Sequence, residues 1–110
     1  MDIRTRNILE HMLEDALEAV QFASGFDDAN LLASSKLHRK AVVMSILNIG
    51  ELAKNLSHEF KLAHNEIPWR KISGMRDIAA HGYHIMDDDI IWYVVRNFIP
   101  RLIYFLESHL

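Results

Sequence analysis

The sequence predicts an all-α fold, an up-and-down bundle of four or five helices. Apolar residues recur at intervals of three and four along much of the chain, which is the spacing of amphipathic helices. No segment alternates apolar and polar residues as a half-buried strand would. With 110 residues, half of them apolar, the chain has the size of one domain. We therefore expect residues 1–110 to form a single helical domain.

The N-terminal half is predicted to contain two long helices joined by a short turn. The first helix spans residues 2 to about 23, where the apolar spacing is regular. Two aspartates can cap a helical turn over residues 27–32, and Ser34 or Ser35 can cap the second long helix, which runs to about Leu56.

The second long helix is apolar on most of its circumference. A stripe wider than one core face needs a second surface to cover it, so we expect the excess to be buried against a second subunit, in a homodimer. The apolar positions are Ala41, Val42, Val43, Met44, Ile46, Leu47, Ile49, Leu52 and Ala53.

The C-terminal half is predicted to continue the bundle. Residues 58–65 are expected to form a short helix or ordered loop, and Pro68 suits the start of the next helix because its missing N–H costs nothing there. The aspartates at 87–89 place negative charge at the N-terminus of the last helix, where the helix dipole favours it. Pro100 should kink that helix.

Composition limits the function classes. The net charge of −3 argues against a general nucleic-acid coat protein, because sequence-independent binding depends on Lys and Arg. Local basic groups occur near residues 36–40 and 70–76, and the first group is expected to be an exposed helix face. The absence of cysteine, of an apolar leader and of an uninterrupted apolar run predicts a cytoplasmic protein without a membrane span.

Chemistry is concentrated between Met75 and Tyr83. Arg76 offers a planar fork of donors that matches phosphate, and His81 can accept and release a proton near neutral pH. On a helix, Asp77 and His81 share a face and can form a hydrogen bond, whereas Arg76 points about 100° away from Asp77. Gly82 is expected to end the helix in a left-handed conformation, with Tyr83 just beyond it.

Other interpretations of these residues remain open. His81 could be a structural residue at a helix end, and with His84 and the aspartates it could bind zinc or manganese, although its spacing is a poor metal signature. The other histidines, at positions 38, 58, 64 and 109, are expected at the surface.

Three further side chains outside the motif need an explanation. Trp92 is expected in the core, and Trp69 is expected to be more open. Glu51, in an otherwise apolar helix, needs a partner if it is buried, and Arg76 is a candidate for that partner.

The motif, Arg76 followed by four residues, His81, one residue and Tyr83, resembles the R-x4-H-x-Y motif of the HepT-like proteins, which belong to the HEPN superfamily. The resemblance extends to segments 48–51 and 67–72 and to the apolar last helix from Asp88 onward. It implies a homodimeric ribonuclease toxin that acts on RNA. It also implies a cognate MntA-like nucleotidyltransferase antitoxin that transfers AMP to Tyr83. Because Arg76 and His81 together can cleave a phosphodiester without metal, no cofactor is expected.

Carried over to this sequence, the resemblance makes Arg76 and His81 catalytic and Asp77 a supporting residue. The expected reaction is transesterification, in which the RNA 2′-OH attacks its own phosphate and needs a base, an acid and a cation. Two motifs across a twofold axis would supply this set. The alternative is a non-catalytic helical module that binds a nucleotide or a nucleotidyltransferase.

Overall fold

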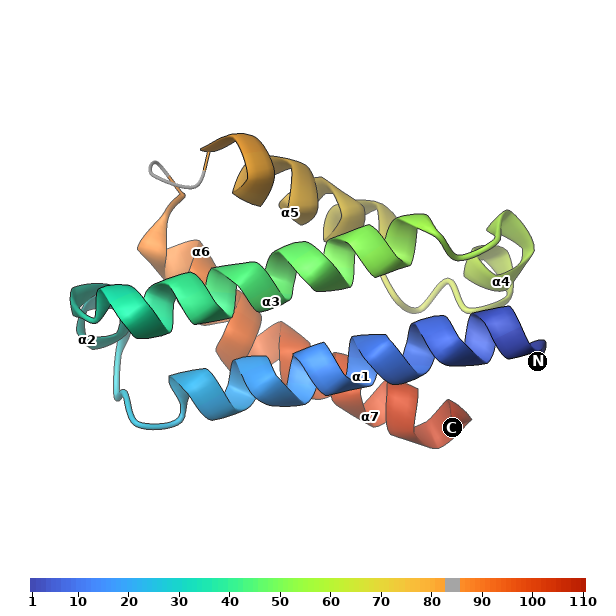
Figure 1. The fold of residues 1–110 in the computed structure, drawn as a ribbon, viewed down its shortest axis with the longest axis horizontal. Coiled ribbons are helices and arrows are strands. Elements are labelled where there is room, and N and C mark those ends of the chain that lie inside the picture. Colours follow the sequence, from blue (N-terminus) through green and yellow to red (C-terminus); the bar gives the residue numbers. More distant parts are fainter. Residues whose placement is uncertain (83–85) are drawn as a thin grey trace.

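The computed structural model describes residues 1–82 and 86–110, and all of its regular structure is helical (Figure 1). This confirms the predicted all-α fold. The helices are α1 (Ile3–Ala23), α2 (Ala29–Ser34), α3 (Lys36–Lys54), α4 (His58–Ala63), α5 (Trp69–Gly82), α6 (Asp88–Tyr93), a π-helical turn (Val94–Phe98) and α7 (Ile99–His109). Every helix predicted from the sequence is present, with boundaries that shift by one or two residues.

Polar residues start the helices where the sequence predicted them. The Asp2 carboxylate accepts a hydrogen bond from the backbone N–H of Thr5 (2.7 Å), and Asp28 caps α2 in the same way. Asp87 precedes α6. Ser35 stands at the start of α3, but its hydroxyl contacts the His38 ring rather than a backbone amide.

Helix α3 is the centre of the bundle. It packs against α1 on one side and α5 on the other, with α2 at its N-terminal end, and α7 lies on the far side of α1 (Figure 1). The broad apolar surface of α3 is therefore covered mainly within one chain, and the excess from which a second subunit was predicted is small. Of its apolar residues, Leu37 and Met44 remain largely exposed.

One continuous core joins the helices. Leu9 and Met12 of α1 meet Ile46 and Ile49 of α3, and Ile72 of α5 closes the cluster from the other side. The C-terminal helices contribute further buried residues, namely Ile91, Val95, Ile99, Leu102 and Leu106.

The hydrogen-bonding pattern of the last helix changes just before Pro100, where the sequence predicted a kink. A π-helical turn at Val94–Phe98 separates α6 from α7, and Pro100 lies in the first turn of α7. Pro100 prevents regular α-helical hydrogen bonding at this point, because proline has no N–H to donate and its ring crowds the carbonyl group one turn earlier. The wider π turn accommodates it.

The two tryptophans exchange the positions expected of them. Trp69 is buried, and its indole Nε1 donates to the carbonyl oxygen of His64 (3.0 Å), whereas Trp92 is half-buried with the Arg96 guanidinium over its ring. The prediction that Trp69 is the more open residue was wrong. Its ring fills the space between α4 and α7 beside Phe60 and Phe105.

The prediction of surface positions for the outlying histidines was also wrong in part. His58 is exposed, but His64 and His109 are half-buried against the Phe105 ring, and His38 packs on Phe26. None of the helices in the described ranges combines the length and the hydropathy needed to cross a membrane.

Candidate active site around Arg76 and His81

A close approach of two helices positions Arg76. A Cβ atom added at Gly50 would lie 2.5 Å from the Arg76 Cβ and 2.8 Å from the carbonyl oxygen of Ile72. Only a residue without a side chain permits this distance between α3 and α5. Gly50 therefore brings the last turns of α3, with Glu51 and Lys54, against the middle of α5.

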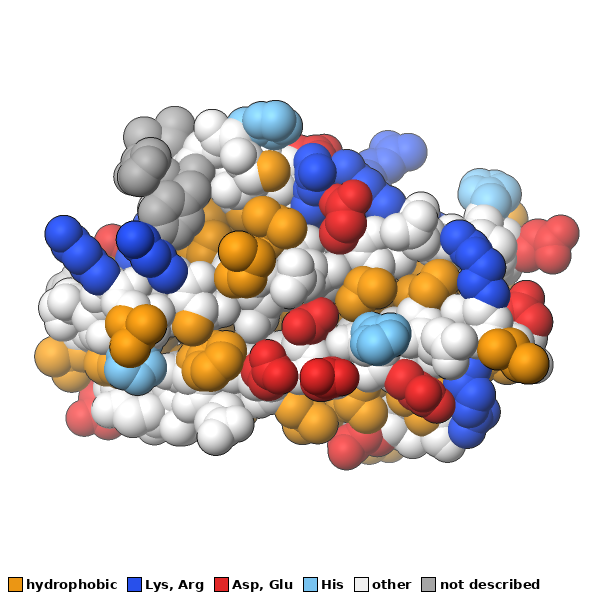
Figure 2. Space-filling model, in the orientation of Figure 1, with side chains coloured by type: hydrophobic (Ala, Val, Ile, Leu, Met, Phe, Trp, Pro, Cys, Tyr) orange, Lys and Arg blue, Asp and Glu red, His pale blue; other side chains and the backbone are white. Residues whose placement is uncertain are grey.

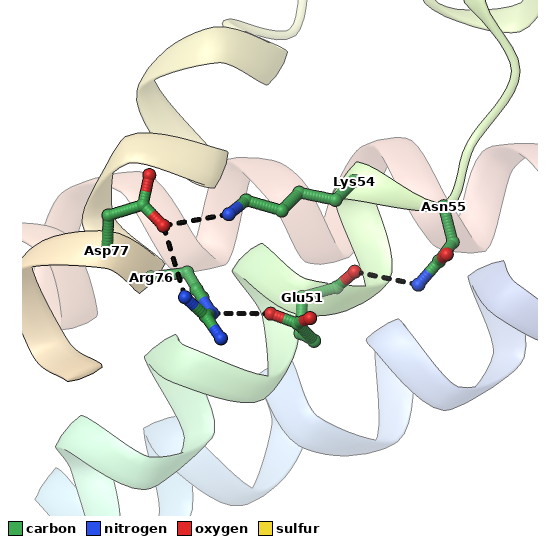
Figure 3. A network of polar contacts seen from close by, with 5 residues as sticks. All are labelled: Glu51, Lys54, Asn55, Arg76 and Asp77. Carbon is green, nitrogen blue, oxygen red and sulfur yellow. Dashed lines mark hydrogen bonds and ion pairs between the residues drawn. The ribbon is translucent and has the colours of Figure 1, made fainter.

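Arg76 is the centre of a charged network between these helices (Figure 3). Its Nε forms an ion pair with the Glu51 carboxylate, and its Nη1 donates to Asp77 Oδ1 (3.2 Å). Lys54 Nζ donates to the same Asp77 oxygen at 2.7 Å. The predicted pairing of Glu51 with Arg76 is confirmed, although the Glu51 side chain is 48% exposed rather than buried.

The network favours the charged forms of Asp77 and Arg76. The hydrogen bond from Lys54 lowers the pKa of Asp77 below its usual value, and Arg76 lowers it further. The hydrogen bond to Asp77, followed by contact with Glu51, raises the pKa of Arg76. The Nε atom of Arg76 is buried and faces Glu51 without a well-aligned hydrogen bond, so the guanidinium keeps unused donor capacity.

The hydrogen bond that helical spacing predicted between Asp77 and His81 is not formed, because the Asp77 carboxylate is turned to Lys54 and Arg76. His81 is exposed in the last turn of α5 and makes no hydrogen bond or ion pair with any residue in the described part of the chain. The Asp77 carboxylate thus contacts the two cations of the network instead of His81.

Helix α5 includes Gly82 itself, so this glycine does not lie beyond the helix end as predicted. The Tyr83 and His84 predictions fall outside the described residues. Within the described ranges, no group of three His, Cys, Asp or Glu side chains is arranged to hold a metal ion.

Arg76 and His81 point in different directions on one chain. Five residues of an α-helix turn the side-chain direction by about 500°, which leaves the two side chains about 140° apart. Arg76 faces α3, whereas His81 borders a shallow pocket of about 450 Å³ lined chiefly by Met75, Ile78, Met86 and Ile90. Within one chain, α5 therefore does not direct the guanidinium and the imidazole at a common atom.

The exposed Lys and Arg side chains do not form one continuous basic surface on the face shown in Figure 2. On the face shown in Figure 2, Lys and Arg side chains lie in separate groups, and acidic side chains run through the middle over α1. Lys36 and Lys40 are exposed as predicted, but Arg39 is half-buried and its guanidinium donates to Asp88 (2.7 Å) and to the backbone oxygen of Met86. Any contact with nucleic acid must therefore be local.

Sequence reasoning missed Lys54 and gave Gly50 no structural role. The signal for Lys54 was present, because Glu51 and Lys54 stand three positions apart and share one face of a helix that is otherwise apolar. Nothing in the sequence alone indicated that this face meets Arg76 and Asp77.

The structure is a small helical bundle in which an Arg and a His stand five residues apart near the end of one helix, and this combination is typical of HEPN-type helical domains. Residues 12–109 match the family described as Ribonuclease HepT-like. The chain belongs to this family, within the HEPN superfamily, and the resemblance seen in the sequence is confirmed.

Curated relatives span most of the chain. A protein of Caldanaerobacter subterraneus subsp. tengcongensis named "Putative RNase" is 36% identical over 97 residues, which cover 88% of this chain and 86% of that protein. The "Probable ribonuclease HepT" of Thermococcus cleftensis is 36% identical over 93 residues, or 82% of this chain and 84% of that protein. A "Putative RNase" of Methanocaldococcus jannaschii is 31% identical over 103 residues, or 94% and 84%. No solved structure matches.

Proposed function

We propose that this protein is a metal-independent endoribonuclease in which Arg76 and His81 act on the RNA phosphodiester. The observation that carries the proposal is the state of His81, an exposed imidazole with no described partner, five residues after an arginine. An imidazole that is free of structural contacts is available for proton transfer. Membership of the ribonuclease HepT-like family supports the same activity.

The reaction is transesterification. A base removes the proton of the 2′-OH, the 2′-oxygen attacks the adjacent phosphorus, and the bond to the 5′-oxygen breaks as an acid protonates that oxygen. The products are a 2′,3′-cyclic phosphate and a 5′-hydroxyl. Arg76 stabilises the negative charge that grows on the phosphorane oxygens.

A homodimer completes the site. One motif supplies one imidazole, and the two side chains diverge by about 140° on their helix. Two copies of α5 facing one cleft supply two imidazoles and two guanidinium groups, as the chemistry requires. Exposed apolar side chains beside His81, namely Ile78 on α5 and Ile90 on α6, are available for contact with a second copy.

The activity belongs, in this proposal, to a toxin–antitoxin pair in the cytoplasm, and membership of the HepT-like family supports this role. The proposed antitoxin is a nucleotidyltransferase that transfers AMP to Tyr83, two residues after His81. The added nucleotide carries a negative phosphodiester into the neighbourhood of the catalytic groups, where it competes with RNA by charge and by volume.

The activity is tested with purified protein and RNA in the presence of EDTA. We expect cleavage with cyclic-phosphate ends, and a loss of about 10²-fold or more in His81→Ala, the scale of a lost general acid or base. His58→Ala, which changes an exposed histidine of α4, should keep the wild-type rate. A loss of less than about tenfold in His81→Ala would remove His81 from the mechanism.

The shared cleft is tested by mixing two inactive chains. Arg76→Ala and His81→Ala are co-expressed with different tags, and the heterodimer is isolated by two affinity steps. It combines one guanidinium with one of the two imidazoles, whereas each homodimer lacks one kind of group entirely, so it should cleave RNA about tenfold or more faster than either homodimer, though more slowly than the wild type. A heterodimer no faster than the homodimers, or a monomer in solution, would refute the composite site.

The alternative is a non-catalytic module that binds a nucleotide or a nucleotidyltransferase. It is favoured by one observation, the engagement of Arg76 by Glu51 and Asp77, because an arginine held by two carboxylates is what a purely structural role would require. Under this alternative, RNA remains intact in the EDTA assay, and Arg76→Ala changes only thermal stability.

A further inference from the structure

We propose that Lys54 is the second cation of a phosphate-binding site that it forms with Arg76, and that the Asp77 carboxylate occupies the place of an RNA phosphate in the free protein. The ligand is a phosphodiester group of single-stranded RNA. The inference rests on the proposed function in taking RNA as the ligand, and it assigns a binding role to a residue outside the family motif.

Two cations from different helices converge on one oxygen atom. Lys54 Nζ at the end of α3 donates to Asp77 Oδ1 at 2.7 Å, and Arg76 Nη1 on α5 donates to the same atom at 3.2 Å (Figure 3). A non-bridging phosphate oxygen carries similar negative charge and accepts the same charge-assisted hydrogen bonds. The position of Asp77 Oδ1 is therefore a place where a phosphate oxygen would receive two donors at once.

The cations have donors to spare. Lys54 makes one hydrogen bond to a described residue with its three N–H groups, and Arg76 uses two of its five, one in a hydrogen bond to Asp77 and one in the ion pair with Glu51. Both cations contact the same one of the two Asp77 carboxylate oxygens, whereas a phosphodiester that is not tied to α5 can turn both of its non-bridging oxygens toward them. The guanidinium can then bind in the bidentate manner that suits phosphate.

The site is open, and its present occupant can leave. The exposed fractions of the side chains are 38% for Lys54, 54% for Asp77 and 28% for Arg76. Asp77 is short, lies at the surface of α5 and has no third partner among the described residues, so rotation of its side chain vacates the position. Glu51 pairs with a different nitrogen of Arg76, Nε, and keeps the guanidinium in place during the exchange.

A purely structural network is the competing explanation, in which the four charges only tie α3 to α5. The two explanations predict opposite effects of Asp77→Asn on RNA binding. Removing a carboxylate that competes with phosphate tightens binding, whereas removing a structural partner of Arg76 leaves binding unchanged or weakens it.

The test uses the full chain and a fluorescein-labelled 2′-O-methyl oligouridine, which binds as RNA does but lacks the attacking hydroxyl. Fluorescence anisotropy gives its Kd over a range of salt concentrations. In Lys54→Gln we expect binding about fivefold weaker near 0.1 M salt, with a salt slope reduced by about 0.7, as for one lost single-strand phosphate contact. In Asp77→Asn we expect binding about fivefold tighter, the effect of one like charge at close range in water.

Lys40→Gln is the matched control. It removes the same charge from an exposed lysine of the same helix, about 20 Å from Lys54 along the axis, and should change neither Kd nor slope beyond about twofold. Lys54→Gln equal to Lys40→Gln, or Asp77→Asn no tighter than wild type, would overturn the inference. If Lys54→Gln does not fold, as judged by circular dichroism, Asp77→Asn decides alone.

The outcomes separate this inference from the proposed activity. Cleavage of unmodified RNA by the wild type, together with unchanged probe binding in Lys54→Gln, preserves the ribonuclease and refutes the phosphate site. Probe binding that follows both expectations, without any cleavage of unmodified RNA, supports the phosphate site and refutes the ribonuclease activity. A wild type that does not bind the probe refutes the phosphate site directly.

Discussion

The contact between Gly50 and α5 provides a quantitative test of the structure. Gly50→Ala adds one Cβ atom, which would lie 2.5 Å from the Arg76 Cβ and 2.8 Å from the Ile72 carbonyl oxygen. Two carbon atoms normally touch at about 3.5 Å or more, so the shortfall is about 1 Å. Neither clashing atom can rotate away, because one belongs to the backbone and the other is fixed to it. The two helices must separate.

The expected cost follows from two opposing terms. Overpacking of a well-packed contact costs about 1–3 kcal/mol, and the rigid atoms involved place this change at the upper end. Alanine in a helix gains about 1 kcal/mol over glycine. The net destabilisation is about 2 kcal/mol. For a chain of this length the entropy of unfolding converts it to a fall in Tm of about 8 °C.

Thermal unfolding followed by circular dichroism measures this fall. Gly74→Ala is the matched control, because the same substitution in the middle of α5 meets no atom within 4 Å. It should gain up to about 1 kcal/mol and raise Tm by a few degrees. A Gly50→Ala protein as stable as the wild type, beside a stabilised Gly74→Ala, would refute the close packing of α3 on α5.

Three further predictions concern charge and burial. The pKa of Asp77 is lowered in the folded protein, so its carboxylate stabilises the fold above the unfolded pKa of 3.8, and this stabilisation is lost as the pH falls through the lower folded pKa. In urea unfolding, Asp77→Asn should therefore have a lower free energy of unfolding than the wild type at pH 7 and the same free energy near about pH 2. The pKa of Asp15 is raised in the folded protein, chiefly by burial, so ionisation of this carboxyl destabilises the fold as the pH rises above its unfolded pKa of 3.8. Asp15→Asn should therefore have a higher Tm than the wild type at pH 7 and the same Tm near about pH 2.5. Trp69→Phe should cost about 1–3 kcal/mol and remove the blue-shifted part of the tryptophan fluorescence, whereas Trp92→Phe should cost less than about 1 kcal/mol and remove the red-shifted part; equal costs would contradict the burial of Trp69.

The helices and their starts could be predicted because they depend on local sequence. The spacing of Leu9 and Met12 defines the buried face of α1, and Asp28 caps α2 through a bond to its own neighbour three residues on. The effect of Pro100 on the last helix follows from the covalent structure of proline, whose ring leaves no backbone N–H to donate. None of these features needs knowledge of which helix packs on which.

Apart from the end of α5 at Gly82, the errors have one cause, because each depends on a contact between distant segments. Trp69 is buried by α4 and α7, and three helices cover most of the broad apolar face of α3 within one chain. Asp77 has a helical neighbour in His81, four residues on, but Lys54 from α3 holds its carboxylate instead. Periodicity indicates which face of a helix is apolar, and it does not indicate the partner.

The two carboxylates that pair with Arg76, those of Glu51 and Asp77, are both about half-exposed to solvent. Ion pairs that are open to solvent contribute little, because both charges are well hydrated when apart. The Asp77 side chain is 54% exposed, so its contact with Arg76 orients the guanidinium without holding it tightly, and a phosphate that replaces the Asp77 carboxylate exchanges one anion for another. The larger requirement falls on His81, which no described contact positions. If the imidazole meets the phosphate held by Arg76, the second copy of the chain or the RNA itself must bring it there, and the heterodimer of Arg76→Ala and His81→Ala distinguishes these two routes.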